Sequence, residues 1–408
     1  MSLTYHTLTL PNKLRIVHIP TSSPVAYCGL AVNAGSRDEV EEKFGLAHFV
    51  EHTIFKGTKK RRSWHILNRM ERIGGELNAY TAKEETLVYS IFPTEHFERA
   101  VELIADLIAN STFPDGELEK EREVVIDEIN SYRDTPSEAI YDDYEDLIFS
   151  GHKLGHNILG SKEDLNRITS SDCRAFLDEL YVPENMVFFS MGNQTFKQVV
   201  KYAEKHLGVM NHSLAQREII KPVKAHSFIK TLPIDSHQSH TVFGAPTFGM
   251  FDDRKYALSL LTNILGGPGM NSILNVLMRE KRGYVYTVEA TSTLFSDCGL
   301  FTIYFGSDDC HVKPCLKIIN NQFDVFSNKV ISDKALDAAK RQYLGQLLVS
   351  YENKESVALA AGKSMLYFDK ISSLDEVAKK IQAIAPQEIQ DMATLIGDAN
   401  NYSILTMD

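Results

Sequence analysis

The sequence predicts an α+β protein of two homologous α/β-sandwich domains, each a mostly antiparallel sheet with helices packed on one side. Its 408 residues are more than one ordinary hydrophobic core contains. The order strands, helices, paired strands, helices, strand occurs twice, each time over about 200 residues, which indicates an internal duplication. A polar stretch of mixed charge separates the two occurrences. We therefore expect domains at residues 1–208 and 227–408, joined by a linker at 209–226.

The first half combines alternating apolar patterns with amphipathic ones. Alternation and short apolar runs between turn residues predict strands at residues 7–10, 14–19, 27–33, 76–82, 85–92 and 186–191. Helices are expected around residue 48 and at 63–73, 95–108, 115–132, 135–149, 171–180 and 197–207. The amphipathic spacing is seen at 95–108, the helix at 115–132 is highly charged, and Ser63 is a plausible N-cap. The expected strands lie at the start of this half, as a pair in its middle and at its end, an order that is compatible with a single sheet.

The second half repeats this order. Strands are expected at residues 228–232, 238–244, 286–294, 299–306 and 402–406. Helices are expected at residues 254–265, before residue 279, at 312–328, at 332–351 and in a final region that ends near 395. The match between the halves is one of element order, not of residue identity.

Composition restricts the class of protein. The chain has 43 basic and 54 acidic residues and a formal net charge of −11, which disfavours a general nucleic-acid-binding function. No stretch approaches the length of an apolar membrane span, and the first residues do not resemble a targeting leader. Five cysteines with irregular spacing are expected to be reduced thiols. We expect a cytoplasmic protein without a membrane partner.

The segment His48-Phe49-Val50-Glu51-His52 carries the strongest chemical signal. Two histidines four residues apart lie on the same side of a helix, and Glu51 points to nearly the same side. Two imidazoles and a carboxylate that converge are what a zinc ion and its water require. The spacing is the inverted form of a known zinc-protease helix.

A catalytic zinc ion needs a third protein ligand. The helix expected at 115–132 offers Glu121 and Glu128, which are seven residues apart and so face the same side. Glu128 follows the apolar residues 124–126, which should press this helix into the core. A carboxylate there can meet the two imidazoles, and Glu121 can support them.

Four blocks of the sequence, residues 45–58, 75–81, 121–128 and 277–286, resemble the pitrilysin-type inverted zincins. The resemblance is to the branch of mitochondrial processing peptidase and its bacterial relatives, and it covers nearly the whole chain. It implies one zinc ion per chain. It also implies the roles of five residues: His48, His52 and Glu128 as zinc ligands, Glu51 as general base and Glu121 in support.

The resemblance implies substrate-binding residues as well. Arg279 and Tyr286 match a pair that reaches the substrate backbone and carbonyl oxygen from the second domain, although Tyr284 leaves the identity of the tyrosine open. Four residues resemble an edge strand that binds an extended peptide by strand addition. They are Asn78, Ala79, Tyr80 and Thr81.

These observations predict a zinc metalloendopeptidase that cleaves peptides or unfolded polypeptide segments bound as an added strand in a chamber between the domains. Because one chain carries both the zinc motif and the Arg/Tyr pair, we expect a homodimer, with a heterodimer of homologous chains as the alternative. Two other functions remain open: a catalytic subunit that is active only with a different partner, and a non-proteolytic scaffold. The four residues His48, Glu51, His52 and Glu128 argue against the scaffold.

Overall fold

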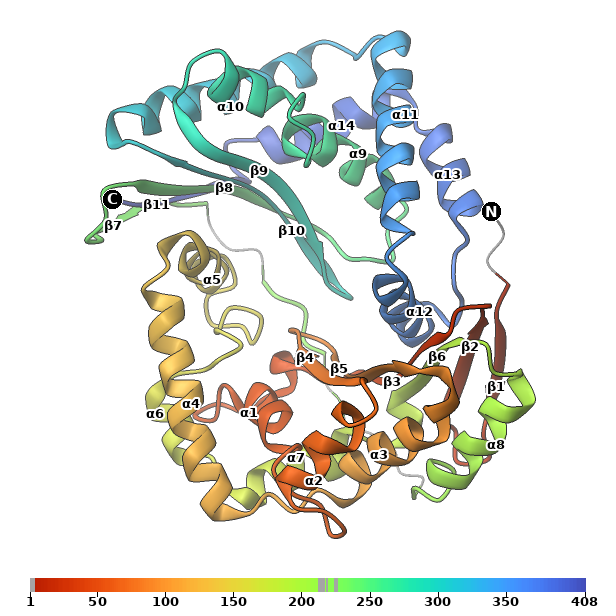
Figure 1. The fold of residues 1–408 in the computed structure, drawn as a ribbon. Helices are drawn as coiled ribbons and strands as arrows, with labels where there is room; N and C mark the ends of the chain where they lie inside the picture. Colours follow the sequence, from red (N-terminus) through yellow and green to blue (C-terminus); the bar gives the residue numbers. More distant parts are fainter. Residues whose placement is uncertain (1–3, 212–216, 218, 224–226) are drawn as a thin grey trace. The chain divides into compact units, whose positions relative to one another are not determined.

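The computed structural model describes residues 4–211, 217, 219–223 and 227–408 (Figure 1). The chain forms two compact units. The first consists of Met1–Ile129, Asn157–Ile219 and Val349–Leu374, and the second of Asn130–His156, Ile220–Leu348 and Asp375–Asp408. Each unit thus contains one segment from the opposite half of the sequence. The expected linker at 209–226 lies partly outside the described residues.

The first unit contains a six-stranded mixed sheet with the order β1-β2-β6-β3-β5-β4. The strands are β1 His6–Thr9, β2 Arg15–Pro20, β3 Val25–Val32, β4 Glu76–Thr81, β5 Thr86–Pro93 and β6 Met186–Gly192. Strands β2 and β6 are parallel, and every other pair is antiparallel. The edge strand β4 pairs with β5 on one side, with Tyr80 opposite Leu87.

Helices cover both faces of this sheet because both faces are apolar. The strand residue Phe188 points into the larger core. That core is completed by α1 Leu46–Thr53, α2 Ser63–Glu71, α3 Phe97–Asn110, α4 Asp115–Arg133, α7 Ser170–Leu180 and α8 Phe196–His206. The next residue, Phe189, faces the other side, where α12 Lys354–Phe368 packs. A Cβ at Gly362 of α12 would lie 2.6 Å from the Phe189 ring, so the helix lies close against the sheet.

The second unit contains a five-stranded mixed sheet with the order β7-β11-β8-β10-β9. The strands are β7 Ile229–Leu232, β8 Ser239–Phe248, β9 Val285–Leu294, β10 Cys298–Ser307 and β11 Ser403–Met407. Strands β7 and β11 are parallel, and the other pairs are antiparallel. The edge strand β9 pairs with β10, as β4 pairs with β5 in the first sheet.

Helices also cover both faces of the second sheet. Phe243 and Phe301 face a core formed with α9 Lys255–Gly266, α10 Asp309–Asn328 and α14 Pro386–Gly397. Val242 and Leu300 face α5 Pro136–Ile148, whose Tyr144 is fully buried. The remaining helices are α6 Lys162–Arg167, α11 Asp333–Ser350, α13 Leu374–Ala383 and the short η1 Ser36–Asp38, η2 Thr94–His96, η3 Pro183–Asn185 and η4 Asn275–Glu280.

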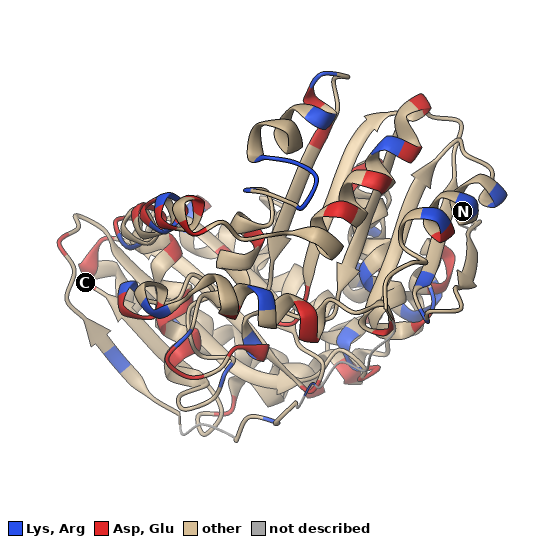
Figure 2. Cartoon of the chain, turned by 90° about the horizontal axis from the view of Figure 1, so that it is seen from below, with Lys and Arg blue, Asp and Glu red and all other residues tan. Residues whose placement is uncertain are grey.

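The predicted fold class is confirmed: two units, each with a mainly antiparallel sheet and helices. The helices predicted on one side of each sheet are present, and α12 and α5 add a layer on the other side that the sequence analysis did not predict. Charged residues lie mainly on helices and loops (Figure 2), because both faces of the strands are covered. Within the described part of the chain, every helix is too short or too polar to cross a membrane.

Candidate metal centre

The helix α1 begins at a glycine that its surroundings require. Gly45 is the N-cap and has φ = 93°, in the left-handed region. A Cβ there would lie 2.5 Å from the carbonyl oxygen of Leu159, so a side chain fits neither the conformation nor the space. From this start, one turn of helix places His48 and His52 over one another, with their ring centroids 4.5 Å apart.

Glu128 of α4 completes a cluster with these two histidines. The ligand atoms of His48, His52 and Glu128 all lie within 4.8 Å of one another. The Oε2 atom of Glu128 is 3.9 Å from Nε2 of His48 and 3.6 Å from Nε2 of His52. Within residues 4–211, 217, 219–223 and 227–408, this is the group of histidine, cysteine and acidic side chains that could hold a metal ion.

Glu121 orients the second histidine. Its Oε1 atom is 2.9 Å from Nδ1 of His52, and its Oε2 atom is 2.6 Å from Nζ of Lys56. Burial favours the neutral form of Glu121, but the hydrogen bonds with His52 and Lys56 hold the pKa of its carboxyl below the usual value. With Nδ1 engaged in this bond, the free nitrogen of His52 is Nε2, which faces Glu128.

The electrostatics of the two histidines differ. Burial, followed by the charge of His52, lowers the pKa of His48 to about 3, so this imidazole is neutral at physiological pH and its nitrogen can serve as a ligand. Burial also acts against the charge on His52. The hydrogen bond with Glu121 and the charges of Glu51, Glu121 and Glu128 outweigh it and raise the pKa of His52.

Glu51 lies between the cluster and the edge strand. Burial raises the pKa of its carboxyl, while hydrogen bonding with Thr81 and the charge of His52 oppose the shift. Thr81 is the last residue of β4. A carboxyl with a raised pKa, next to the cluster and to an open strand edge, has the properties of a general base.

The donor set fits zinc. Two imidazole nitrogens and one carboxylate oxygen are a ligand set of catalytic zinc sites, which keep one position open. Zinc bonds of 2.0–2.2 Å in tetrahedral geometry separate ligand atoms by about 3.3–3.6 Å. The 3.6 Å separation matches the upper end of this range, and the 3.9 Å separation is slightly longer. Glu128 is 41% exposed, so the cluster can be reached from solvent.

The predicted substrate residues fall into two groups. Asn78, Ala79, Tyr80 and Thr81 lie together on β4, at the edge of the first sheet, and are half-buried. Arg279 and Tyr286 belong to the second unit, at η4 and at the start of β9. Tyr286 is 65% exposed, and its Oη is 3.4 Å from Oδ1 of Asp308. Their role remains a prediction.

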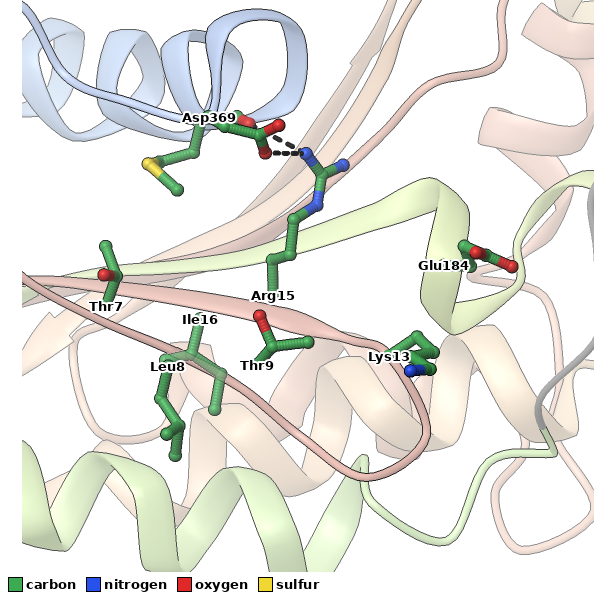
Figure 3. A pocket seen from close by; sticks show the side chains of 9 residues that line it. Thr7, Leu8, Thr9, Lys13, Arg15, Ile16, Glu184 and Asp369 are labelled. Carbon is green, nitrogen blue, oxygen red and sulfur yellow. Dashed lines mark hydrogen bonds and ion pairs between the residues drawn. The ribbon is translucent and has the colours of Figure 1, made fainter.

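A separate hollow of about 730 Å³ lies in the first unit beside β1 and β2 (Figure 3). Arg15 and Asp369 form an ion pair of 2.6 Å in its wall. The Arg15 guanidinium also donates to the carbonyl oxygens of Met365 and Leu366, at 3.0 and 3.3 Å, and thus closes the end of α12. None of the predicted site residues lines this hollow.

The sequence analysis missed two residues near the cluster. Lys56 follows His52 by four positions, a spacing that could have suggested it as a partner for an acidic residue. Glu39 accepts hydrogen bonds from the backbone at the start of α1. An N-cap glycine without a side chain, as at Gly45, is a signal that another residue must supply the acceptor.

Comparisons with known proteins agree with this geometry. Two family models match, "Insulinase (Peptidase family M16)" over residues 15–162 and "Peptidase M16 inactive domain" over residues 167–343. An uncharacterized zinc protease of Bacillus subtilis is 32% identical over 387 residues and covers 94% of each chain. One from Streptomyces coelicolor is 30% identical over 407 residues, 97% of this chain and 88% of the relative.

Solved structures share the fold. A protease from Helicobacter pylori superposes with a TM-score of 0.90 at 19% identity and covers 99% of both chains. The structure described as a peptidase M16 inactive domain from Pseudomonas fluorescens has a TM-score of 0.91 at 19% identity, with coverage of 99% of this chain and 98% of that one.

Proposed function

Because the chain belongs to the insulinase family of peptidases, family M16, and has curated relatives named zinc proteases, we propose that it is a zinc-dependent endopeptidase. Its substrates are extended peptides or unfolded polypeptide segments. The observation that carries this proposal is the convergence of His48, His52 and Glu128 within 4.8 Å, next to the half-buried carboxyl of Glu51.

In this proposal, His48, His52 and Glu128 hold one zinc ion. Bound there, zinc would supply a Lewis acid that polarises the scissile carbonyl and lowers the pKa of a water molecule. Glu51 takes a proton from the attacking water and delivers it to the leaving amine nitrogen. Glu121 keeps Nε2 of His52 directed at the ion through its 2.9 Å bond with Nδ1.

The edge strand β4 aligns the substrate. Since β5 is the neighbour of β4 among the described strands, the outer backbone groups of β4 can bind an extended peptide by strand addition. Thr81, at its end, interacts with Glu51, so a strand added there runs past the base. Because strand addition uses main-chain hydrogen bonds, the enzyme should accept substrates with many different side chains.

The proposal gives the second unit a role in the same reaction. Arg279 and Tyr286 supply hydrogen-bond donors to the substrate backbone and to the oxygen that becomes negative during attack. The presence of both the zinc motif and this pair in one chain supports a self-sufficient homodimer. Light scattering of the purified chain should then give twice its 46.0 kDa mass.

The decisive experiment measures zinc content and cleavage of a fluorescence-quenched peptide that is blocked at both ends. A peptide without free termini isolates endopeptidase activity. Wild-type protein with zinc should cleave it at internal bonds, identified by mass spectrometry, and Glu51→Gln should bind zinc but not cleave. Glu71→Gln, an exposed carboxylate change on α2, is the matched control.

Three outcomes separate the alternatives. A protein that binds no zinc and does not cleave the peptide would leave only the scaffold, and equal cleavage by wild type and Glu51→Gln would rule out Glu51 as the base. Zinc binding without cleavage by the purified chain, restored by a homologous partner, would indicate a subunit that needs another chain. Cleavage by the chain alone supports the self-sufficient enzyme.

A further inference from the structure

A short turn connects two parts of the proposed site, the helix α1 that carries the zinc motif and the substrate edge strand β4. The turn consists of residues 35–39 and contains η1 Ser36–Asp38. It lies between the end of β3 and the start of α1. We call it the capping turn, because its last residue, Glu39, provides the cap of α1.

Glu39 replaces the side chain that the N-cap glycine lacks. It is fully buried. Its Oε2 atom accepts a hydrogen bond from the Gly45 amide at 2.9 Å, and its Oε1 atom accepts one from the Ala47 amide at 2.7 Å. A carboxylate at this end of a helix satisfies orphan N–H groups and favours the helix dipole. Glu39 therefore holds the first turn of the helix that carries His48, Glu51 and His52.

The same turn is bound to the hairpin formed by β4 and β5. The amides of Ser36 and Arg37 donate to the carbonyl oxygens of Ala82 and Lys83, at 3.2 and 2.8 Å. The Arg37 guanidinium pairs with Glu84 at 2.7 Å, with both side chains at most 3% exposed. Contact with this hairpin is very close, because a Cβ at residue 35, a glycine, would lie 2.3 Å from the Ala82 oxygen.

The conformation of the turn is itself fixed. Asp38 accepts a hydrogen bond from the Gly35 amide at 3.0 Å through Oδ2. Its Oδ1 atom pairs with Nε of Arg217 at 2.5 Å, and both side chains are less than 10% exposed. Arg217 also donates to the carbonyl oxygen of Glu84 at 3.2 Å and to Asn33. Arg217 thus connects the turn to the hairpin a second time.

These contacts set the position of α1 relative to β4. The helix α1 packs on β4, on α7 and on the capping turn. We propose that the capping turn fixes the position of α1, which carries the zinc motif, relative to β4, the proposed substrate edge strand. Glu39 is then a positioning residue that acts through α1. This inference rests on the proposed function, since it concerns where an added strand lies relative to the zinc ligands and Glu51.

The test substitutes Glu39→Gln, which preserves size but places an amide N–H₂ opposite a backbone N–H. Zinc affinity, measured by chelator competition, should fall about 10-fold, the lower end for residues that orient a ligand. At saturating zinc, kcat should fall while KM for the blocked peptide changes less than about 2-fold. Mass spectrometry should show new minor cleavage sites, because the substrate strand is no longer held at one position relative to the zinc ligands and Glu51.

The matched control is Glu388→Gln in the second unit. Glu388 also caps a helix, α14, by accepting a hydrogen bond from the Ala385 amide at 2.7 Å. This variant should keep wild-type zinc affinity, kcat and product pattern. If Glu39→Gln behaves like Glu388→Gln in all three measurements, the inference is wrong.

A second variant covers the case in which Glu39→Gln does not fold. Glu39→Asp keeps the charge but is one methylene shorter, so it cannot reach both amides equally well, and a smaller loss in the same direction is expected. Wild-type behaviour of this variant would contradict the positioning role. The zinc measurement does not depend on peptidase activity. A wild-type protein that binds zinc without cleaving would therefore disprove the proposed function and still test Glu39.

Discussion

The first and second sheets have the same core of five strands. The order β2-β6-β3-β5-β4 of the first matches β7-β11-β8-β10-β9 of the second, and in both the first two strands are parallel and the others antiparallel. Each ends in an edge strand that forms a hairpin with its neighbour, β4 or β9. The helices beside these edges differ. Helix α1 carries two histidines and a glutamate, whereas α9 buries Ala257, Leu258 and Leu261.

The long helices of the two units differ in the same way. Helix α4 buries the charged residues Glu121 and Arg122, and helix α11 buries Lys340. Glu121 pairs with His52 and Lys56 beside the metal cluster. Lys340 donates to the backbone oxygens of Gln382 and Ile384, at 2.8 and 2.6 Å, and so closes the end of α13. The buried Glu121 of α4 thus lies beside the candidate metal ligands, whereas the buried Lys340 of α11 holds the end of another helix.

The largest expected effect comes from Glu128→Gln on α4. Loss of the third ligand should reduce zinc affinity by more than about 100-fold, the upper end for residues that only orient a ligand. Peptide cleavage should fall to background. Chelator competition and the quenched peptide measure both, and Glu123→Gln, an exposed change on the same helix, is the control. Tight zinc binding by Glu128→Gln would remove α4 from the metal centre.

Tyr286→Phe tests whether the second unit contributes to peptide cleavage. If Tyr286 donates to the developing oxyanion, kcat should fall by about 10²- to 10³-fold with zinc affinity unchanged. Tyr304→Phe, on the same sheet, is the control, since the hydroxyl of Tyr304 is buried and bonded to His240 at 2.8 Å. An unchanged kcat for Tyr286→Phe would confine the chemistry to the first unit.

Glu121→Gln should have a smaller effect than loss of a ligand. A glutamine at this position cannot accept from both His52 and Lys56, so His52 becomes less well oriented. Zinc affinity should fall by about 10- to 100-fold. Isothermal titration with zinc, after removal of metal, gives the value. A wild-type affinity would mean that α1 alone orients its histidines.

Lys340→Met should change stability without changing the metal centre. It leaves the oxygens of Gln382 and Ile384 without their buried donor, a loss of about 1–3 kcal/mol in the free energy of unfolding. Denaturant unfolding followed by circular dichroism measures it, and zinc affinity and kcat should stay at wild-type values. A reduced zinc affinity would contradict the division of roles between α4 and α11.

Local patterns predicted much of the fold and the site. Alternation and short apolar runs predicted the strands of both sheets, such as the expected strand at 299–306, which is found as Cys298–Ser307. The spacing of His48 and His52, and of Glu121 and Glu128, follows from helix geometry, so the residues that could meet were evident from sequence. Partners distant in sequence were not evident. The bonds from Glu39 to the start of α1, and from Lys56 to Glu121, depend on how loops fold back in space.

The additional helices, α12 on the first sheet and α5 on the second, could not be predicted for the same reason. Helix α12 is rich in alanine and other apolar residues without a marked amphipathic face, so its sequence does not identify the sheet that it covers. Its contact with the first sheet depends on the close fit of Gly362 against Phe189, which lie 173 positions apart in a chain of 408 residues. Pattern analysis finds faces that need covering, but shape complementarity decides which helix covers them.

The position of α12 in the chain has a consequence for synthesis. The first sheet has all its strands once β6 ends at Gly192, but the face with Val17, Ile19 and Phe189 is covered only when Lys354–Phe368 has been made. At 5–20 residues per second, a ribosome needs roughly 10–35 s for that interval. During this time the nascent chain carries an uncovered apolar sheet face. That face is where a chaperone should bind the nascent chain, and where a product truncated before α12 should aggregate.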